Sequence, residues 1–132
     1  MSPTFQWSVR VYYEDTDVGG VVYYANYLKF MERARTEYLR AHGFEQDRLM
    51  AEDGVMFAVV QAELTFRKAG RFNDLLHVSC VIYEHTRTTV SFAQEVRRND
   101  ELLCEGRIRA ACLDVRSLRP RAIPERVLEA AA

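Results

Sequence analysis

The residues best suited to chemistry lie between Glu14 and Tyr24, where a polar loop runs into a helix-like pattern. The loop EDTDVGG carries Asp15, Asp17 and paired glycines, a composition that breaks a strand and permits unusual backbone angles. A helix N-terminus exposes unpaired N–H groups that polarise a carbonyl oxygen docked there. A carboxylate facing that carbonyl attacks it or activates water. The segment therefore holds both halves of an acyl-transfer site, although on physics alone the commoner use of Asp15 or Asp17 is helix capping or turn bonding.

The helix needed to supply those N–H groups is predicted over residues 24–42. Its apolar positions follow the i, i+3, i+4, i+7, i+11 spacing of one buried stripe, namely Tyr27, Phe30, Met31, Ala34 and Tyr38. On the other faces, Glu32 with Arg35 and Glu37 with Arg40 are three residues apart and are expected to pair across a turn.

Period-two patterns predict strands before and after this helix. The predicted strands cover residues 5–13, 55–66, 75–84, 88–98 and 102–115, with a short second helix at 45–53 and a helical turn at 124–131. In the long strand after Gly54, one face is predicted to be apolar: Ala58, Val60, Ala62, Leu64 and Phe66. The other face is mixed: Phe57, Val59, Gln61, Glu63 and Thr65. One helix with an antiparallel meander is an α+β pattern, in which the sheet wraps the helix.

The loop and helix together carry a recognisable motif. The run Y-x-x-T-D-x-x-G-x-V-Y-x-x-N-Y, from Tyr13 to Tyr27, is followed by F-x-E-x-A-R, from Phe30 to Arg35. This signature resembles that of the 4-hydroxybenzoyl-CoA thioesterase-like branch of the hotdog superfamily, and especially the tol-pal-associated acyl-CoA thioesterases. The segment RKAGRFNDLLHV at 67–78 and the closing strands also fit. The resemblance implies a single hotdog thioesterase domain over residues 1–132, a five-stranded antiparallel sheet wrapped around one long central helix.

The resemblance also implies roles for two residues of the motif. The aspartate of its T-D pair is the family's essential carboxylate and corresponds to Asp17. The family's carbonyl-polarising backbone N–H, at the start of the central helix, corresponds to Tyr24. Many tol-pal-associated members carry histidine there, whereas this chain reads Val22-Tyr23-Tyr24. The 4-hydroxybenzoyl branch uses tyrosine, which indicates that the backbone amide matters more than the side chain.

Candidate substrate-binding residues lie outside the motif. Thr65, on the mixed face of the long strand, is placed either to touch substrate or to pack against a second subunit. Arg67, Lys68 and Arg87 are suited to binding CoA phosphates, with a solvated rim as the simpler alternative. The resemblance favours Arg87 most, because related thioesterases place basic residues in this turn against the nucleotide.

Other chemistries find little support in the sequence. It contains no G-x-S-x-G, G-x-G-x-x-G or P-loop motif, its three histidines lack metal-ligand spacing, and its three cysteines fit small hydrophobes better than a zinc site or a disulfide framework. We therefore expect no cofactor and no metal. The net charge of −1 argues against binding nucleic acid. No apolar run suits membrane insertion and the N-terminal residues lack a signal-peptide pattern, so a cytoplasmic location is expected.

These observations favour an acyl-CoA thioesterase that hydrolyses its substrate to free acid and CoA. A non-catalytic hotdog module that binds acyl chains or a partner is the main alternative, and Asp17 at the family position argues against it. A hotdog dehydratase or hydratase would need a histidine that the segment between the first strand and the helix lacks. Long edge strands and one helix on one sheet face predict a homo-oligomer, a dimer or a tetramer. The resemblance implies that each active site lies at a subunit boundary.

Overall fold

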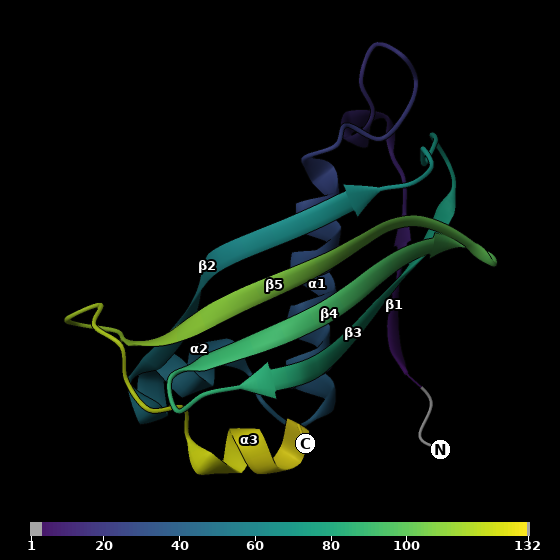
Figure 1. Ribbon diagram of the computed structural model, residues 1–132. Helices are drawn as coiled ribbons and strands as arrows, with labels where there is room; N and C mark the ends of the chain where they lie inside the picture. The colour runs from purple at the N-terminus through teal and green to yellow at the C-terminus, as the bar shows by residue number, and fades with distance from the viewer. Residues whose placement is uncertain (1–3, 132) are drawn as a thin grey trace.

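The structure is a computed structural model that describes residues 4–131 as one curved sheet around a long helix (Figure 1). The strands are β1 (Phe5–Arg10), β2 (Val55–Phe66), β3 (Leu75–His85), β4 (Thr89–Arg98) and β5 (Glu101–Asp114). The helices are α1 (Asn26–Ala41), α2 (Gln46–Arg48) and α3 (Glu125–Ala131), with a 3-10 turn at Tyr13–Asp15 and a π-helical turn at Leu49–Asp53. The expected elements are present, but two boundaries differ: the first strand ends at Arg10 rather than at residue 13, and the long helix begins at Asn26 rather than at residue 24.

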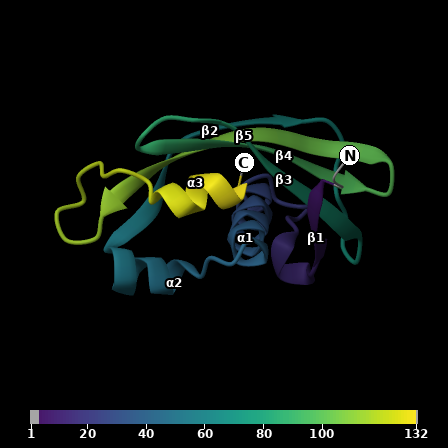
Figure 2. The same ribbon diagram turned by 90° about the horizontal axis from the view of Figure 1, so that it is seen from below.

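All five strands pair in antiparallel fashion in the order β1-β3-β4-β5-β2, so that β1 and β2 are the edges. Seen along the layers in Figure 2, the sheet arches over α1, and α2 and α3 lie on the same concave side. No helix covers the convex outer face in the described part of the chain. The predicted α+β architecture, a sheet wrapped around one long helix, is confirmed.

The buried stripe of α1 fills the space under the arch. Each of its five predicted residues is at most 5% exposed: Tyr27, Phe30, Met31, Ala34 and Tyr38. The polar side chain of Gln94, on β4, is also buried and donates from Nε2 to the Met31 carbonyl oxygen at 3.0 Å. This hydrogen bond satisfies a buried amide and fixes the helix against the middle of the sheet.

The faces of β2 differ from the alternation predicted for it. Val59 pairs with Ala110 and Gln61 pairs with Arg109, so that Val60 is an extra residue on this strand, a β-bulge. One extra residue exchanges the two faces, because side chains alternate with a period of two. Before the bulge, the concave face therefore carries Phe57 and Val59 rather than Ala58 and Val60. After the bulge, it carries Ala62, Leu64 and Phe66 as predicted.

The cysteines fit their expected role as small hydrophobes. Cys80, Cys104 and Cys112 are free and buried. Burial raises the pKa of the Cys80 and Cys104 thiols to about 12, which keeps both protonated and removes them as candidate nucleophiles. Separately, none of the helices in residues 4–131 is long and apolar enough to cross a membrane.

Candidate active site

Asp17 stands in a tight loop that is built almost entirely by backbone bonds. Its N–H donates to the Val21 carbonyl at 2.9 Å, and its own carbonyl accepts from the Gly20 N–H at 3.0 Å. Gly20 has a φ of +79°, which a residue with a side chain rarely adopts. The Asp17 carboxylate is exposed and accepts one hydrogen bond, from the Gly19 N–H to Oδ1 at 2.8 Å. The second carboxylate oxygen has no partner in residues 4–131 and is free to act on a substrate or on water.

Asp15 has a different environment two residues earlier. It is buried, and its Oδ2 accepts the Tyr12 N–H at 2.8 Å. Its carbonyl oxygen accepts both the Tyr23 N–H and the Asn26 Nδ2–H, each at 2.9 Å. Asp15 therefore closes the loop and ties it to the first turn of α1, whereas Asp17 remains open to solvent.

The start of α1 lies beside this loop. The helix begins at Asn26, two residues later than predicted, so that Tyr24 precedes it. Neighbouring amides are engaged, since Tyr23 donates to Asp15 and Asn26 donates to Tyr23. Within the described residues, the Tyr24 N–H donates no hydrogen bond. An unpaired N–H next to the positive end of a helix is suited to polarising a carbonyl oxygen.

The Tyr24 side chain is 61% exposed and takes part in an aromatic group around the helix start. Its ring lies 4.9 Å from the Tyr23 ring and 6.1 Å, edge-on, from the Phe66 ring. A hydrogen bond with Tyr24 is the main cause that raises the pKa of Tyr23. The Tyr24 ring therefore packs among aromatic neighbours, while its backbone N–H remains available.

The segment after β2 packs against the Asp17 loop. The Val22 N–H donates to the Gly70 carbonyl at 2.8 Å, and the Gly70 N–H donates to the Tyr27 hydroxyl at 3.1 Å. A Cβ on Gly70 would lie 3.0 Å from a Val22 methyl carbon and 3.3 Å from the Tyr27 hydroxyl, so a larger residue would have to push these neighbours back by a few tenths of an ångström. No role was predicted for Asn26 or Gly70, and Tyr27 was predicted to belong to the core alone. For Asn26 and Tyr27 the available signal was their place in the quoted motif.

The four predicted substrate-binding residues are not brought together within one chain. Arg67 and Lys68 lie on the segment that packs against the Asp17 loop, and they form exposed ion pairs with Glu105 at 3.4 Å and Glu101 at 3.1 Å. Arg87 is exposed in the β3–β4 turn, at the other end of the sheet, where its carbonyl oxygen accepts the Ile123 N–H.

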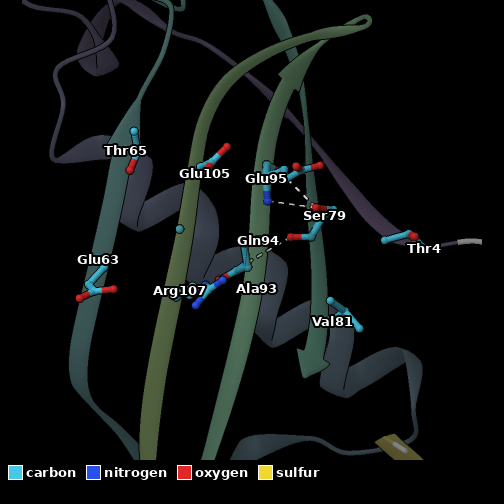
Figure 3. Close-up of a pocket in the computed structure, with 11 residues that line it drawn as sticks. Thr4, Glu63, Thr65, Ser79, Val81, Ala93, Gln94, Glu95, Glu105 and Arg107 are labelled. Carbon is cyan, nitrogen blue, oxygen red and sulfur yellow. Dashed lines mark hydrogen bonds between the residues drawn. The ribbon is translucent and has the colours of Figure 1, made fainter. Parts of the chain in front are cut away.

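Thr65 lies on the convex outer face of the sheet, where Figure 3 shows it beside a shallow hollow of about 570 Å³. The hollow has a floor of small residues, including Ala93 and Gly106, and a charged rim that includes Glu63 and Arg107. Since α1 lies on the opposite side of the sheet, the Thr65 side chain does not face the Asp17 loop of its own chain. Separately, residues 4–131 contain no group of three or more His, Cys, Asp or Glu side chains placed to hold a metal ion.

An arched antiparallel sheet around one helix, with an aspartate loop at the helix start, defines the hotdog thioesterase class. A family model described as "Thioesterase-like superfamily" matches residues 11–131. The chain belongs to this superfamily.

Among curated proteins, the chain is 43% identical over 123 residues to "Acyl-CoA thioesterase YbgC" of Haemophilus influenzae, covering 93% of this chain and 90% of that protein. Among solved structures, it is similar to a probable thioesterase from Bartonella henselae, with 30% identity, a TM-score of 0.88 and coverage of 92% and 100% of the two chains. It also shares the fold of a 4-hydroxybenzoyl CoA thioesterase mutant in complex with 4-hydroxybenzoyl CoA, with a TM-score of 0.90 at 20% identity, covering 99% and 100%. These similarities extend over nearly the whole chain.

Proposed function

We propose that this protein is an acyl-CoA thioesterase, which converts an acyl-CoA and water into a free acid and CoA. Two observations carry the proposal: the Asp17 carboxylate is exposed, and the Tyr24 N–H, just before α1, donates no hydrogen bond within the described residues. The acyl-CoA thioesterase named above, at 43% identity, supports the same reaction.

In the proposed reaction, the thioester carbonyl oxygen docks on the Tyr24 N–H, which stabilises the negative charge that develops there. Asp17 then acts as general base or as nucleophile. As a base it takes a proton from water, the water oxygen bonds to the carbonyl carbon, and the C–S bond breaks to release CoA. As a nucleophile it forms a mixed anhydride with loss of CoA, and water then hydrolyses the anhydride.

We propose that Arg67, Lys68 and Arg87 contact the phosphates of CoA and that Thr65 contacts the substrate or a second subunit. Asp17 and Arg87 lie at opposite ends of the sheet within one chain. A substrate that reaches both residues is therefore more simply bound by Asp17 of one protomer and Arg87 of another. This placement supports an active site at a subunit boundary.

The proposed assembly is a homo-oligomer, either a dimer or a tetramer, of single-domain protomers spanning residues 1–132. The long strand β2 is a sheet edge with unpaired backbone groups, and two copies can pair there about a two-fold axis. The uncovered outer face offers a second contact for a tetramer. Three free, buried cysteines fit the reducing cytoplasm, which is the proposed location.

A steady-state assay of free thiol release over a panel of acyl-CoA esters tests the reaction. Turnover that depends on Asp17 is expected for at least one ester, whereas binding without turnover across the panel would instead indicate a non-catalytic module. Sedimentation at low micromolar concentration should give a mass at least twice the 15.3 kDa of one chain. A fully active species of monomer mass would refute the shared site.

A further inference from the structure

A small apolar cavity lies under the sheet, on the same side as α1 and α3 and well along α1 from the Asp17 loop. Its volume is about 130 Å³. Apolar side chains from the four strands β2, β3, β4 and β5 and from the helices α1 and α3 form most of its lining, including Leu39, Phe57, Ile82, Phe92, Ala110 and Val127. A cavity of about 150 Å³ with similar walls accommodates benzene in another protein, so this one has the size of a compact six-carbon group.

One wall of this cavity carries a charge. Arg35 of α1 borders it, with its guanidinium carbon 6.0 Å from the centre of the Phe92 ring. Its Nη1 donates to Oε1 of Gln94 at 3.1 Å, and Gln94 is a neutral amide. Burial is the largest influence on Arg35 and lowers the pKa of its guanidinium, because the charge has lost part of its water.

The ion pair predicted between Glu32 and Arg35 is absent. The Glu32 carboxylate, also at the cavity wall, instead accepts a hydrogen bond from the Thr36 hydroxyl at 2.9 Å. Arg35 makes no ion pair with any carboxylate in residues 4–131. By contrast, Glu37 and Arg40, at the same spacing one turn later, do pair.

A partly buried guanidinium that no carboxylate contacts directly is a strong recognition group, even though the Glu32 charge acts on Arg35 from a distance. It has five N–H donors in a planar fork that matches a carboxylate, and among residues 4–131 only the Gln94 amide oxygen accepts from it. Placing a carboxylate against it would offset the cost of removing the charge from water. The apolar walls beside it would remove an apolar tail from water, which favours binding.

We propose that this cavity is a second binding site, which takes a small carboxylic acid with its carboxylate on Arg35 and its compact apolar tail among the side chains around Phe92. The site is separate from the candidate active site of the same chain. Arg35 lies nine residues after Asn26, where α1 begins, which corresponds to about 14 Å along the helix. The acid occupies the cavity in the resting protein and needs no turnover to bind.

The chemistry of this ligand has a consequence that rests on the proposed function. A thioesterase releases a free carboxylic acid, so the ligand class of the cavity is the class of its own product. Accumulated acid would then occupy Arg35 and alter α1, the helix whose first turn supports the reaction. Binding of the acid can be measured without any acyl-CoA, so it is tested independently of the proposed reaction.

The first test is titration of the full-length protein with benzoate and with hexanoate, followed by calorimetry or by NMR. Saturable millimolar or tighter binding is expected for at least one of them. Arg35→Gln should weaken it at least about tenfold, since a hydrogen-bonded charge is typically worth 1.5–3 kcal/mol. The matched control is Arg33→Gln, an exposed arginine on the same helix, which should bind as wild type does. Benzyl alcohol lacks the charge, so its dissociation constants for wild type and for Arg35→Gln should differ by less than about threefold.

A second variant keeps the proposal testable if Arg35→Gln disturbs folding. Ala110→Leu leaves the guanidinium intact and fills the cavity from β5, so it should also weaken benzoate binding at least about tenfold. Asp17→Asn should bind benzoate as wild type does. Absence of saturable binding, or unchanged binding in Arg35→Gln or Ala110→Leu, would overturn the proposal. Loss of binding in Asp17→Asn would do so too, because it would place the acid at the active site instead. None of these outcomes depends on whether acyl-CoA is hydrolysed.

Discussion

The two ends of the sheet are built in different ways. At the Asp17 end, backbone hydrogen bonds join Asp15 to Tyr23, Asp17 to Val21 and Val22 to Gly70, so that three segments hold one another. At the Arg87 end, the backbone of the turn is also held, by the Thr86 N–H on the Thr89 carbonyl at 2.8 Å and the Ile123 N–H on the Arg87 carbonyl at 2.9 Å, but the group proposed to act is the exposed side chain of Arg87.

The difference matches the demands of the two proposed tasks. Bond-making needs reacting atoms held within a few tenths of an ångström, which closed backbone loops provide better than mobile side chains. Holding a solvated phosphate needs charge within reach, and a flexible arginine supplies it. The first end should therefore control turnover and the second should control affinity, and the following changes test that division.

The largest effect is expected for Asp17→Asn. The substitution is nearly isosteric but removes the charge that attack or base catalysis requires, and kcat should fall by about 10²–10⁴. Asp15→Asn is the matched control, since an asparagine oxygen can still accept the Tyr12 N–H. The fall in kcat of this variant should be much smaller. Melting curves should show both variants folded. Equal kcat in Asp17→Asn and wild type would contradict the role given to Asp17.

The next effect is expected for Arg87→Ala. An exposed phosphate contact is worth up to about 1 kcal/mol, so KM for acyl-CoA should rise roughly fivefold with kcat nearly unchanged. A truncated thioester without the nucleotide should be hydrolysed equally by variant and wild type. If the variant lost the same factor on both substrates, Arg87 would have no part in binding phosphate.

A smaller effect is expected for Tyr24→Phe, because the proposed role belongs to the backbone N–H. Turnover should fall less than about threefold, whereas removing a true oxyanion donor typically costs about 10²–10³. Measuring kcat on one good ester decides between these outcomes. A loss of the larger size would move the role to the hydroxyl.

The smallest effect on turnover concerns the support behind the Asp17 end. Arg98 donates to Asp74 Oδ2 at 2.8 Å and to the Ala69 carbonyl at 3.1 Å. These two hydrogen bonds tie the segment that carries Gly70 to β4. Burial raises the pKa of Asp74, but hydrogen bonds from Arg98 and from the Arg71 N–H outweigh it and leave the pKa below its usual value.

A depressed pKa contributes stability above the unfolded pKa of about 3.9, and this stability is lost as the pH falls through the folded value. Asp74→Asn should therefore have a lower melting temperature than wild type at pH 7. The difference between the two melting temperatures should narrow as the pH approaches 3. Turnover at pH 7 and 25 °C should be nearly unchanged. A difference in melting temperature that did not change with pH would show that the Asp74 charge does not contribute to stability through its contact with Arg98.

The sequence predicted most of the fold because its patterns are local. The helix stripe from Tyr27 to Tyr38 and the alternation in 55–66 both follow directly from residue periods. The bulge at Val60 was not visible, because residues 55–60 are all apolar and an extra residue in such a run does not break any alternation of polar and apolar residues. The faces of Phe57 and Ala58 were therefore assigned wrongly.

The candidate site also has a part that could be predicted from the sequence and a part that could not. Asp17 and Tyr24 lie in one contiguous segment, so a motif can relate them. The separation of Arg87 from that segment depends on how strands far apart in sequence pair. Likewise, nothing in the i, i+3 spacing of Glu32 and Arg35 indicates that the arginine binds Gln94, because that contact crosses from the helix to the sheet.

The bulge at Val60 also affects how the edge strand β2 can pair. A flat, regular edge is an open template on which further strands can add without limit, as in fibrils. The extra residue twists this edge, so that only a neighbour with a matching irregularity fits along its full length. An arbitrary regular strand does not satisfy that condition. Val60, which exchanges the two faces of β2, thus also makes this edge a poorer template for open-ended addition of strands.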